Sequence, residues 1–235
     1  MIKLVDTLKV TNVLSDPTRY NIYQHIIREQ KDVSVVEISD LFNIHPNVAR
    51  LHLSKLEDVN MVTSHYSKSG KGGRPSRLYR LSEQVIEMNF PARDYRTLSS
   101  IALEALMDLG EAGERALYST GKKYGLQIAE TYKNSTHSAV TIQQKIEVLE
   151  DAGTILGLYA KFSYNEEKQS IRFTVNNCPF KEIAATNHTV VCKMHHLFLK
   201  GIFDVLFTES QLILEENMFE GNCKNCKYIA NIAIV

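Results

Sequence analysis

Apolar residues recur at spacings of three and four in the N-terminal part of the chain, a pattern that predicts amphipathic helices. The first helix is expected at 10–30, with Ser15 or Asp16 as its N-cap and Pro17 in the first turn, where proline is tolerated. The second, SVVEISDLF, follows a short break and is capped by Ser34. The beginning of the chain is therefore predicted to be mainly helical.

A third helix is predicted at about 46–59, after the break FNIHP. The spacing of its apolar residues predicts an inward face made of Val48, Ala49, His52, Leu53 and Leu56. The outward face then carries the polar and basic residues Asn47, Arg50, Ser54 and Lys55. Asparagine suits adenine and arginine suits guanine in the major groove, whereas Ser54 and Lys55 suit phosphates. These four are candidate DNA contacts, and the alternative is an ordinary surface helix.

Two strand-like segments, MVTSHYS and SRLYRLS, follow and enclose a glycine-rich loop, which predicts a β-hairpin. The order helix, helix, turn, helix and hairpin is that of a winged helix-turn-helix domain. The segment 64–80 has no acidic residue and carries five cations, Lys68, Lys71, Arg74, Arg77 and Arg80. Such a hairpin suits DNA phosphates or a minor groove, so the first four cations join the candidate contacts.

The basic loop has two other interpretations. A P-loop requires G-x-x-x-x-G-K-[ST] between a strand and a helix, whereas GKGGRPS lacks that spacing and precedes a strand-like segment. A loop that is merely solvated is the other alternative. The succession of a helix-turn-helix and a basic hairpin favours DNA binding over both.

The pattern changes near residue 90. Helices are predicted at 96–109, 111–132, about 141–151 and 188–207. Gly153 is expected to end the third of these, a hairpin turns at 165–168, and the chain closes on a strand. We therefore predict an α+β fold with three regions. They are a winged helix-turn-helix domain at 1–90, a helical dimerisation region at 91–137 and a cysteine-bearing sensor domain at 138–235.

Composition is ordinary for a soluble globular protein, with 44% apolar residues, 23% charged residues and a formal net charge of zero. Asp6 interrupts what would be the core of a signal peptide, and no window approaches the roughly 18 apolar residues of a membrane helix. We expect a cytoplasmic protein without a membrane partner. Because no catalytic triad, dinucleotide fingerprint or carboxylate pair stands at a useful spacing, an enzyme is the least favoured class.

Four cysteines, Cys178, Cys192, Cys223 and Cys226, all lie in the last quarter of the chain. In a reducing cytosol this clustering favours a metal or redox site over disulfides, and thiolates suit zinc or iron–sulfur clusters. The irregular spacing, with Cys192 expected at the start of a helix, favours a cluster over a zinc ribbon. The alternatives are buried cysteines that act as small apolar residues and a redox dithiol at C-x-x-C.

Several segments resemble a known family. DPTRYNIYQHI, VARLHLSKLEDVNMV and GKGGRPSRLYRLS resemble the winged-helix regulators related to the ArsR and DeoR groups. NNCPFKEIAATNHTVVCKMHHLFLKGIF resembles the cysteine-bearing segment of SufR-type iron–sulfur regulators, which place C-P-F, His-Thr and V-C-x-M-[NH]-H in that order. The resemblance covers nearly the whole chain.

The resemblance implies a homodimeric repressor of iron–sulfur assembly genes that binds a double-stranded DNA operator and holds one iron–sulfur cluster, of the [4Fe–4S] type, per protomer. Cys178 and Cys192 match the family's first two ligand positions. Cys223 and Cys226 lie where the family carries its remaining cysteines, and which of them ligates stays open. His195 falls where the family has Asn or His, which favours a structural role for it over ligation. The alternative is a zinc-stabilised winged-helix protein without redox sensing.

Overall fold

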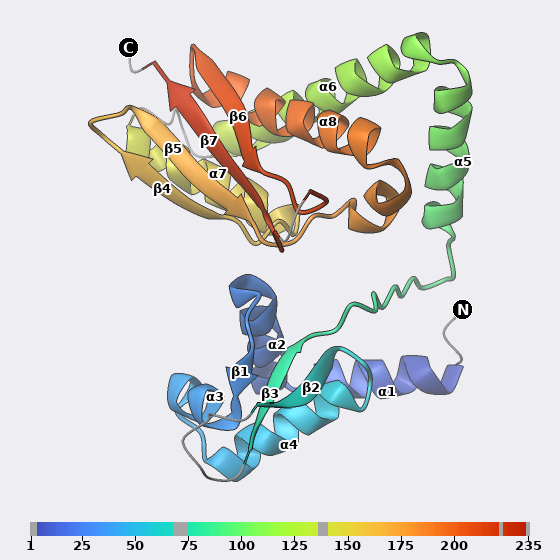
Figure 1. The fold of residues 1–235 in the computed structure, drawn as a ribbon, viewed down its shortest axis with the longest axis vertical. Helices are drawn as coiled ribbons and strands as arrows, with labels where there is room; N and C mark the ends of the chain where they lie inside the picture. The colour runs from blue at the N-terminus through green and yellow to red at the C-terminus, as the bar shows by residue number, and fades with distance from the viewer. Residues whose placement is uncertain (1–3, 68–74, 136–140, 221–222, 234–235) are drawn as a thin grey trace. The chain divides into compact units, whose positions relative to one another are not determined.

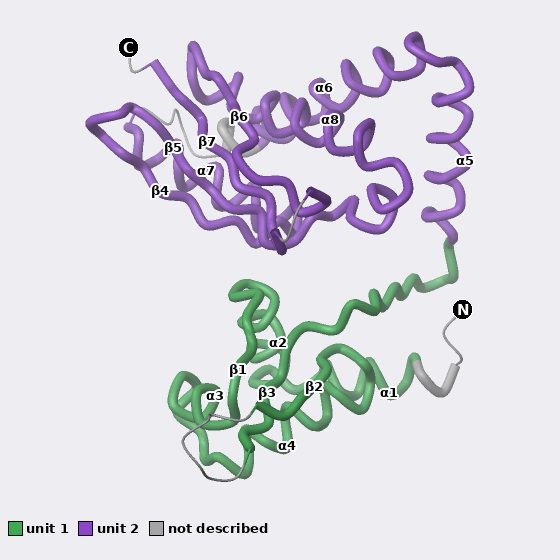
Figure 2. The backbone as a smooth tube through the Cα atoms, viewed as in Figure 1, with its two compact units in different colours: residues 1–93 green, residues 94–235 purple. Residues whose placement is uncertain are grey.

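The computed structural model describes residues 4–67, 75–135, 141–220 and 223–233 (Figure 1). The chain divides into two compact units, Met1–Arg93 and Asp94–Val235 (Figure 2). The first predicted boundary, at residue 90, lies close to this division, whereas the second, at residue 137, falls inside the second unit. The structure thus has two compact units where the sequence predicted three regions. Within the described residues, no helix combines the length and apolar character needed to cross a bilayer.

The first unit has the element order of a winged helix-turn-helix. Its elements are α1 (Leu4–Leu14), α2 (Pro17–Glu29), β1 (Val33–Ser34), α3 (Val35–Phe42), α4 (Pro46–Glu57), β2 (Val62–Ser67) and β3 (Ser76–Leu81). The three strands are antiparallel in the order β1-β3-β2. The helix predicted at 10–30 is in fact two helices, because the Asp16 side chain accepts a hydrogen bond from the Arg19 backbone at 2.8 Å and starts α2 anew.

The core of this unit forms where the helices meet the small sheet. The buried residues with almost no exposed surface include Ile22, Ile26, Val33, Ile38, Ala49, Leu53, Leu56, Val62 and Tyr79. One residue of the predicted inward face of α4 is misplaced, because the Val48 side chain is 40% exposed. His52 is buried as predicted, and burial lowers its pKa, so it packs as a neutral ring.

The second unit is a four-stranded antiparallel sheet with helices (Figure 1). Its elements are α5 (Tyr95–Asp108), α6 (Glu111–Ser135), α7 (Ile142–Ile155), β4 (Lys161–Asn165), β5 (Ser170–Val175), α8 (Lys181–Leu206), β6 (Ser210–Glu216) and β7 (Cys226–Ile232). The strand order is β4-β5-β7-β6, so the last strand of the chain lies inside the sheet beside β5. Side chains of α7, α8, β5, β6 and β7 share one core.

Two predictions for this unit need correction, and one strand is absent from them. Strand β6 was not predicted, because SQLILEE alternates only weakly. Helix α7 continues past Gly153, which is buried inside it, and a left-handed glycine follows only at Gly157, with φ +68°. Helix α8 begins at Lys181 and kinks at Asn187, so Cys192 lies within the helix and not at its start.

Helices α6 and α8 pack with their backbones in close contact. A Cβ atom at Gly125 of α6 would overlap the carbonyl oxygen of Phe198, and one at Gly201 of α8 would overlap the carbonyl oxygen of Lys122. At Gly121, one turn before Gly125, a Cβ would press on Met194. These glycines lower intrinsic helix propensity, but they are what allows the two helices to approach.

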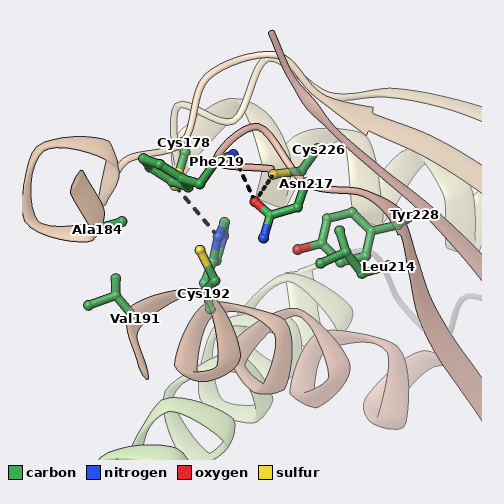
Figure 3. A pocket seen from close by; sticks show the side chains of 10 residues that line it. Cys178, Ala184, Val191, Cys192, Leu214, Asn217, Phe219, Cys226 and Tyr228 are labelled. Carbon is green, nitrogen blue, oxygen red and sulfur yellow. Dashed lines mark hydrogen bonds between the residues drawn. The ribbon is translucent and has the colours of Figure 1, made fainter. Parts of the chain in front are cut away.

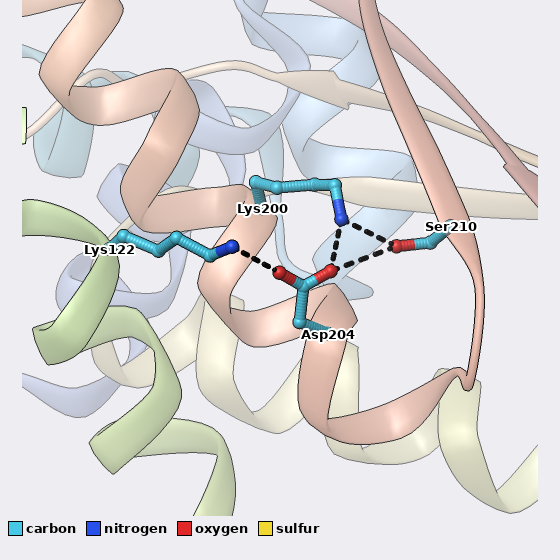
Figure 4. A network of polar contacts seen from close by, with 4 residues as sticks. All are labelled: Lys122, Lys200, Asp204 and Ser210. Atoms are coloured by element: carbon cyan, nitrogen blue, oxygen red, sulfur yellow. Dashed lines mark hydrogen bonds and ion pairs between the residues drawn. The ribbon is translucent and has the colours of Figure 1, made fainter. Parts of the chain in front are cut away.

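An ion-pair network reinforces the same contact (Figure 4). Lys122 of α6 lies 2.8 Å from a carboxylate oxygen of Asp204 on α8, and Lys200 binds the other oxygen. The hydroxyl of Ser210, at the start of β6, lies 3.3 Å from the Lys200 amine. Partial burial raises the pKa of Asp204, but the hydrogen bonds from the two lysines outweigh it, so the pKa lies below its usual value. The carboxylate therefore stays charged and joins two helices and a strand.

We predict that Gly125→Ala destabilises the second unit by about 3 kcal/mol, because a methyl group cannot fit against the α8 backbone without separating the helices. Gly153→Ala is the matched control, since its nearest neighbours would lie 3.7 Å away and alanine favours a helix. Urea unfolding followed by helical circular dichroism measures both. Equal stability of Gly125→Ala and the unsubstituted protein would contradict the packing described.

Candidate functional site

The outward face of α4 carries the four residues that the sequence predicted to contact DNA, Asn47 and Arg50 at base edges and Ser54 and Lys55 at phosphates. Asn47, Arg50 and Lys55 are exposed and Ser54 is half-buried, while the opposite face packs into the core. His45 caps the helix, its ring Nδ1 accepting a hydrogen bond from the Asn47 backbone at 3.2 Å. Helix α3 packs against α4 across a turn in which Asn43 is left-handed, with φ 50°.

Asn47 and Arg50 are coupled one turn apart on this face. Nη1 of Arg50 donates to Oδ1 of Asn47 at 3.0 Å, which holds the two side chains side by side. An amide oxygen has two lone pairs, so Asn47 can still accept a second hydrogen bond. Further along, the Lys55 amine lies 3.7 Å from a carboxylate oxygen of Asp58, an exposed pair that contributes little. Both ends of the face therefore carry polar groups that are available to DNA.

The tip of the hairpin, with Lys68, Lys71 and Arg74, lies outside the described residues. Arg77 lies on β3, where Nη2 meets Oε2 of Glu57 at 2.5 Å and Nε donates to the Ser64 hydroxyl at 2.9 Å. That hydroxyl in turn donates to Glu57 at 2.6 Å. Arg77 thus ties the hairpin to the end of α4, and its charge is largely matched by Glu57.

A second candidate site lies in the C-terminal unit, where Cys178, Cys192 and Cys226 line one small cavity (Figure 3). Cys178 comes from the loop after β5, Cys192 from α8 and Cys226 from the start of β7. His195, Asn217 and Tyr228 line the same cavity. Three segments that are far apart in the sequence therefore bring together three of the four cysteines that were predicted to be ligands.

Strand register explains why these cysteines meet. Cys226 pairs with Val175 across β5 and β7, so Cys178, three residues beyond Val175, comes close to Cys226. Asn225, the residue before β7, is held to the end of β5 by a hydrogen bond, because its side-chain amide donates to the side-chain oxygen of Asn176 at 2.7 Å. Beside the cavity, the Cys226 sulfur accepts a hydrogen bond from the Met218 backbone at 3.4 Å. The sheet thus fixes two cysteines, and α8 supplies the third.

Cys223, the other member of C-x-x-C, is not among the residues that line this cavity. It interacts with Glu216 on the neighbouring strand, which also pairs with Lys227 at 2.9 Å. Among the described residues, no group of three or more His, Cys, Asp or Glu side chains is gathered closely enough to hold a single metal ion. The arrangement is a thiol-lined cavity and not a preformed mononuclear site.

Burial governs the protonation of this cavity. It raises the pKa of the Cys178 thiol to about 12 and also raises the pKa of Cys192 and of Cys226. Burial lowers the pKa of His195 to about 4, with a smaller contribution from His196. His195 Nδ1 lies 3.8 Å from the Cys178 sulfur, and its Nε2 is buried with no hydrogen-bond partner among the described residues. At neutral pH the cavity therefore holds neutral thiols and a neutral imidazole.

Several residues of both sites were not predicted. The link among Glu57, Ser64 and Arg77 depends on strand register, which the sequence does not reveal. Asn217 lies near Cys226 because β6 and β7 pair, and β6 itself was missed. His45 as a cap was also missed, although the following proline and the break before it were a usable signal.

We predict that the reduced protein, free of metal, reacts with iodoacetamide first at Cys223 and last at Cys178. Thiolate is the reactive form, and burial raises the pKa of Cys178 while also blocking access. At neutral pH, Cys178 should react at least roughly tenfold more slowly than Cys223. Peptide mass spectrometry at timed intervals measures the order. Labelling in urea should equalise the four rates, and equal rates without urea would contradict the cavity.

Comparison with known proteins bears on the first unit. A family model described as a helix-turn-helix domain matches residues 14–65, which includes α3 and α4. The chain is 31% identical over 81 residues to the uncharacterized HTH-type transcriptional regulator MJ0229 of Methanocaldococcus jannaschii, a match that covers 34% of this chain and 81% of that protein. Together with the exposed polar face of α4, these matches show that the chain belongs to the helix-turn-helix transcriptional regulators.

Proposed function

We propose that this regulator binds a double-stranded DNA operator as a homodimer, and that an iron–sulfur cluster held by its C-terminal cysteines controls the binding. The observation that carries the proposal is the convergence of Cys178, Cys192 and Cys226 on one cavity. That cavity lies in a different compact unit from the helix-turn-helix. Such a division suits a regulator with separate output and sensor units.

The donor set fits a cluster chemically. Thiolates are the ligands that iron–sulfur clusters require, and three cysteines surround the cavity. His195 is buried and neutral, and its Nε2 has no hydrogen-bond partner among the described residues, so it offers a fourth donor. Cys223 faces Glu216 outside the cavity. We therefore assign the ligands to Cys178, Cys192, Cys226 and His195, which replaces Cys223 of the set expected from the sequence by a histidine expected there to be structural. A cluster bound there would supply a centre whose integrity depends on redox conditions.

The size of the cavity supports a link between cluster binding and conformation. The cavity measures about 10 Å³, which is room for one water molecule. To admit a cluster, the β5 loop, α8 and the start of β7 must move apart from one another. Thiols must also lose their protons on binding, so acid should weaken it. Occupancy would therefore change the relative positions of these three elements.

The alternative is a regulator in which the same cysteines bind a structural zinc ion and the protein does not sense redox conditions. Zinc requires about four donors close enough to surround one ion. Among the described residues no such group exists, so nothing in the geometry favours zinc over a cluster. Repression of iron–sulfur assembly genes rests on the resemblance to SufR-type regulators alone.

Helix α5 supports the homodimer. Its exposed apolar stripe is spaced alternately by three and four, as in helix pairs, and consists of Tyr95, Leu98, Ala102 and Ala105, continued by Leu109, the residue that caps the helix. The opposite side packs inside the same unit through Leu103 and Met107. The two alanines allow a second helix to approach closely. Because the stripe would match its own copy in a two-fold pair, a second copy of this chain is the proposed partner.

We expect anaerobically purified protein to be coloured and to contain about four iron and four sulfide ions per chain. Cys226→Ser should lose the cluster, and Cys223→Ser, the matched control outside the cavity, should keep it. Iron and sulfide analysis with absorption spectra measures both, and fluorescence anisotropy compares DNA affinity with and without the cluster. A colourless protein that holds zinc or no metal would overturn the cluster, and loss in Cys223→Ser would overturn the ligand assignment.

We expect Leu98→Glu to convert the dimer into a monomer, because a charge on the α5 stripe cannot be buried against its copy. Ile155→Glu is the matched control, since Ile155 is an equally exposed apolar residue of α7 in the same unit. Size-exclusion chromatography with light scattering gives the masses. A monomeric unsubstituted protein, or a Leu98→Glu protein that still dimerises, would contradict the assignment.

A further inference from the structure

The outward face of α4 contains two apolar side chains among its polar ones. Leu51 is 56% exposed and Val48 is 40% exposed. With about 100° between successive residues, the buried Ala49, Leu53 and Leu56 define one side of the helix, and Leu51 points almost directly away from it. Asn47 and Ser54 flank Leu51, so the centre of the face is apolar with polar neighbours.

Single exposed apolar residues are common on protein surfaces and need no explanation. These two differ in their position, because they lie on the helix that follows the turn and beside Asn47 and Arg50, which are coupled at 3.0 Å. The family model matches this same helix. The surface that binds this face should therefore present hydrogen-bonding groups and an apolar group side by side.

The major groove offers that combination at A·T pairs. Adenine presents N7 and the N6 amine, which suit asparagine, and thymine presents a C5-methyl group, the apolar feature of the groove. A leucine four residues after Asn47 lies on the same face one turn along the helix, within reach of a neighbouring base step. Arg50 and Lys55 at the edges of the face supply charge for guanine or phosphate.

We infer that Leu51 and Val48 are specificity-determining residues that contact thymine methyl groups in the major groove, next to the base read by Asn47. The inference deepens the proposed function and rests on it, because it requires α4 to enter DNA. It assigns to the preferred operator at least one thymine in the part of each half-site that α4 covers. It also assigns a role to Val48, the residue of the predicted inward face that is exposed.

The experiment begins with selection of bound sites from a random double-stranded pool by the full-length protein in its DNA-binding form. Each thymidine of the selected site is then replaced by deoxyuridine, which removes only the methyl group, and affinity is measured by anisotropy. At one or two positions the affinity should fall about fourfold, as expected for one buried methyl-sized group. The replacement needs no protein variant, so it cannot be confused with misfolding.

The variant Leu51→Ala should abolish the deoxyuridine penalty at one of these positions while leaving the helix intact. Leu41→Ala is the matched control, because Leu41 is 55% exposed on α3, away from this face. Absence of a penalty in the unsubstituted protein, or a penalty that survives in both Leu51→Ala and Val48→Ala, would overturn the inference while DNA binding stands. Failure to select any DNA would overturn the proposed operator binding and the inference together.

Discussion

Contact between the α6 and α8 backbones is the constraint on which the C-terminal unit depends. Side chains at Gly125 and Gly201 would overlap carbonyl oxygens of the facing helix, so the observed approach exists only because both are glycine. The ion pair between Lys122 of α6 and Asp204 of α8 then joins the two helices, and Lys200 on α8 binds the same carboxylate. Because α8 also packs on the sheet, its position is fixed from two sides. Cys192 and His195 lie on α8, so the same contacts fix their positions.

The cysteine cavity follows from this framework and from strand register. Neutral buried thiols cost little, whereas a thiolate there would lack solvation, as the raised pKa of Cys178 indicates. The protonated thiols stabilise the folded state below the ordinary thiol pKa, and that contribution is lost as the pH rises toward the folded value. A metal reverses this balance, because it binds the thiolate and compensates its charge. Under the proposed function, the same cavity would be a small apolar core without a metal and a ligand set with one.

Local signals in the sequence predicted much of the fold. Asp16, Ser34 and Pro46 fix helix starts through contacts within three residues, and such contacts can be deduced from short segments. Strand β6 and the pairing of Cys226 with Val175 depend on residues far apart, so the sequence did not indicate them. Gly153 shows the limit of a local rule, since a glycine ends a helix only where its backbone turns left-handed.

Two details of the first unit show how tertiary contacts reassign residues that look alike in the sequence. Arg77 belongs to a run of five cations, yet strand pairing brings it to Glu57, and this contact positions the hairpin against α4. Val48 and Ala49 are adjacent and both apolar, but neighbours on a helix point about 100° apart. Ala49 lies on the buried side of α4, whereas Val48 points away from it and stays exposed together with Leu51. An amphipathic pattern thus identifies the helix, whereas packing decides which apolar residues remain exposed.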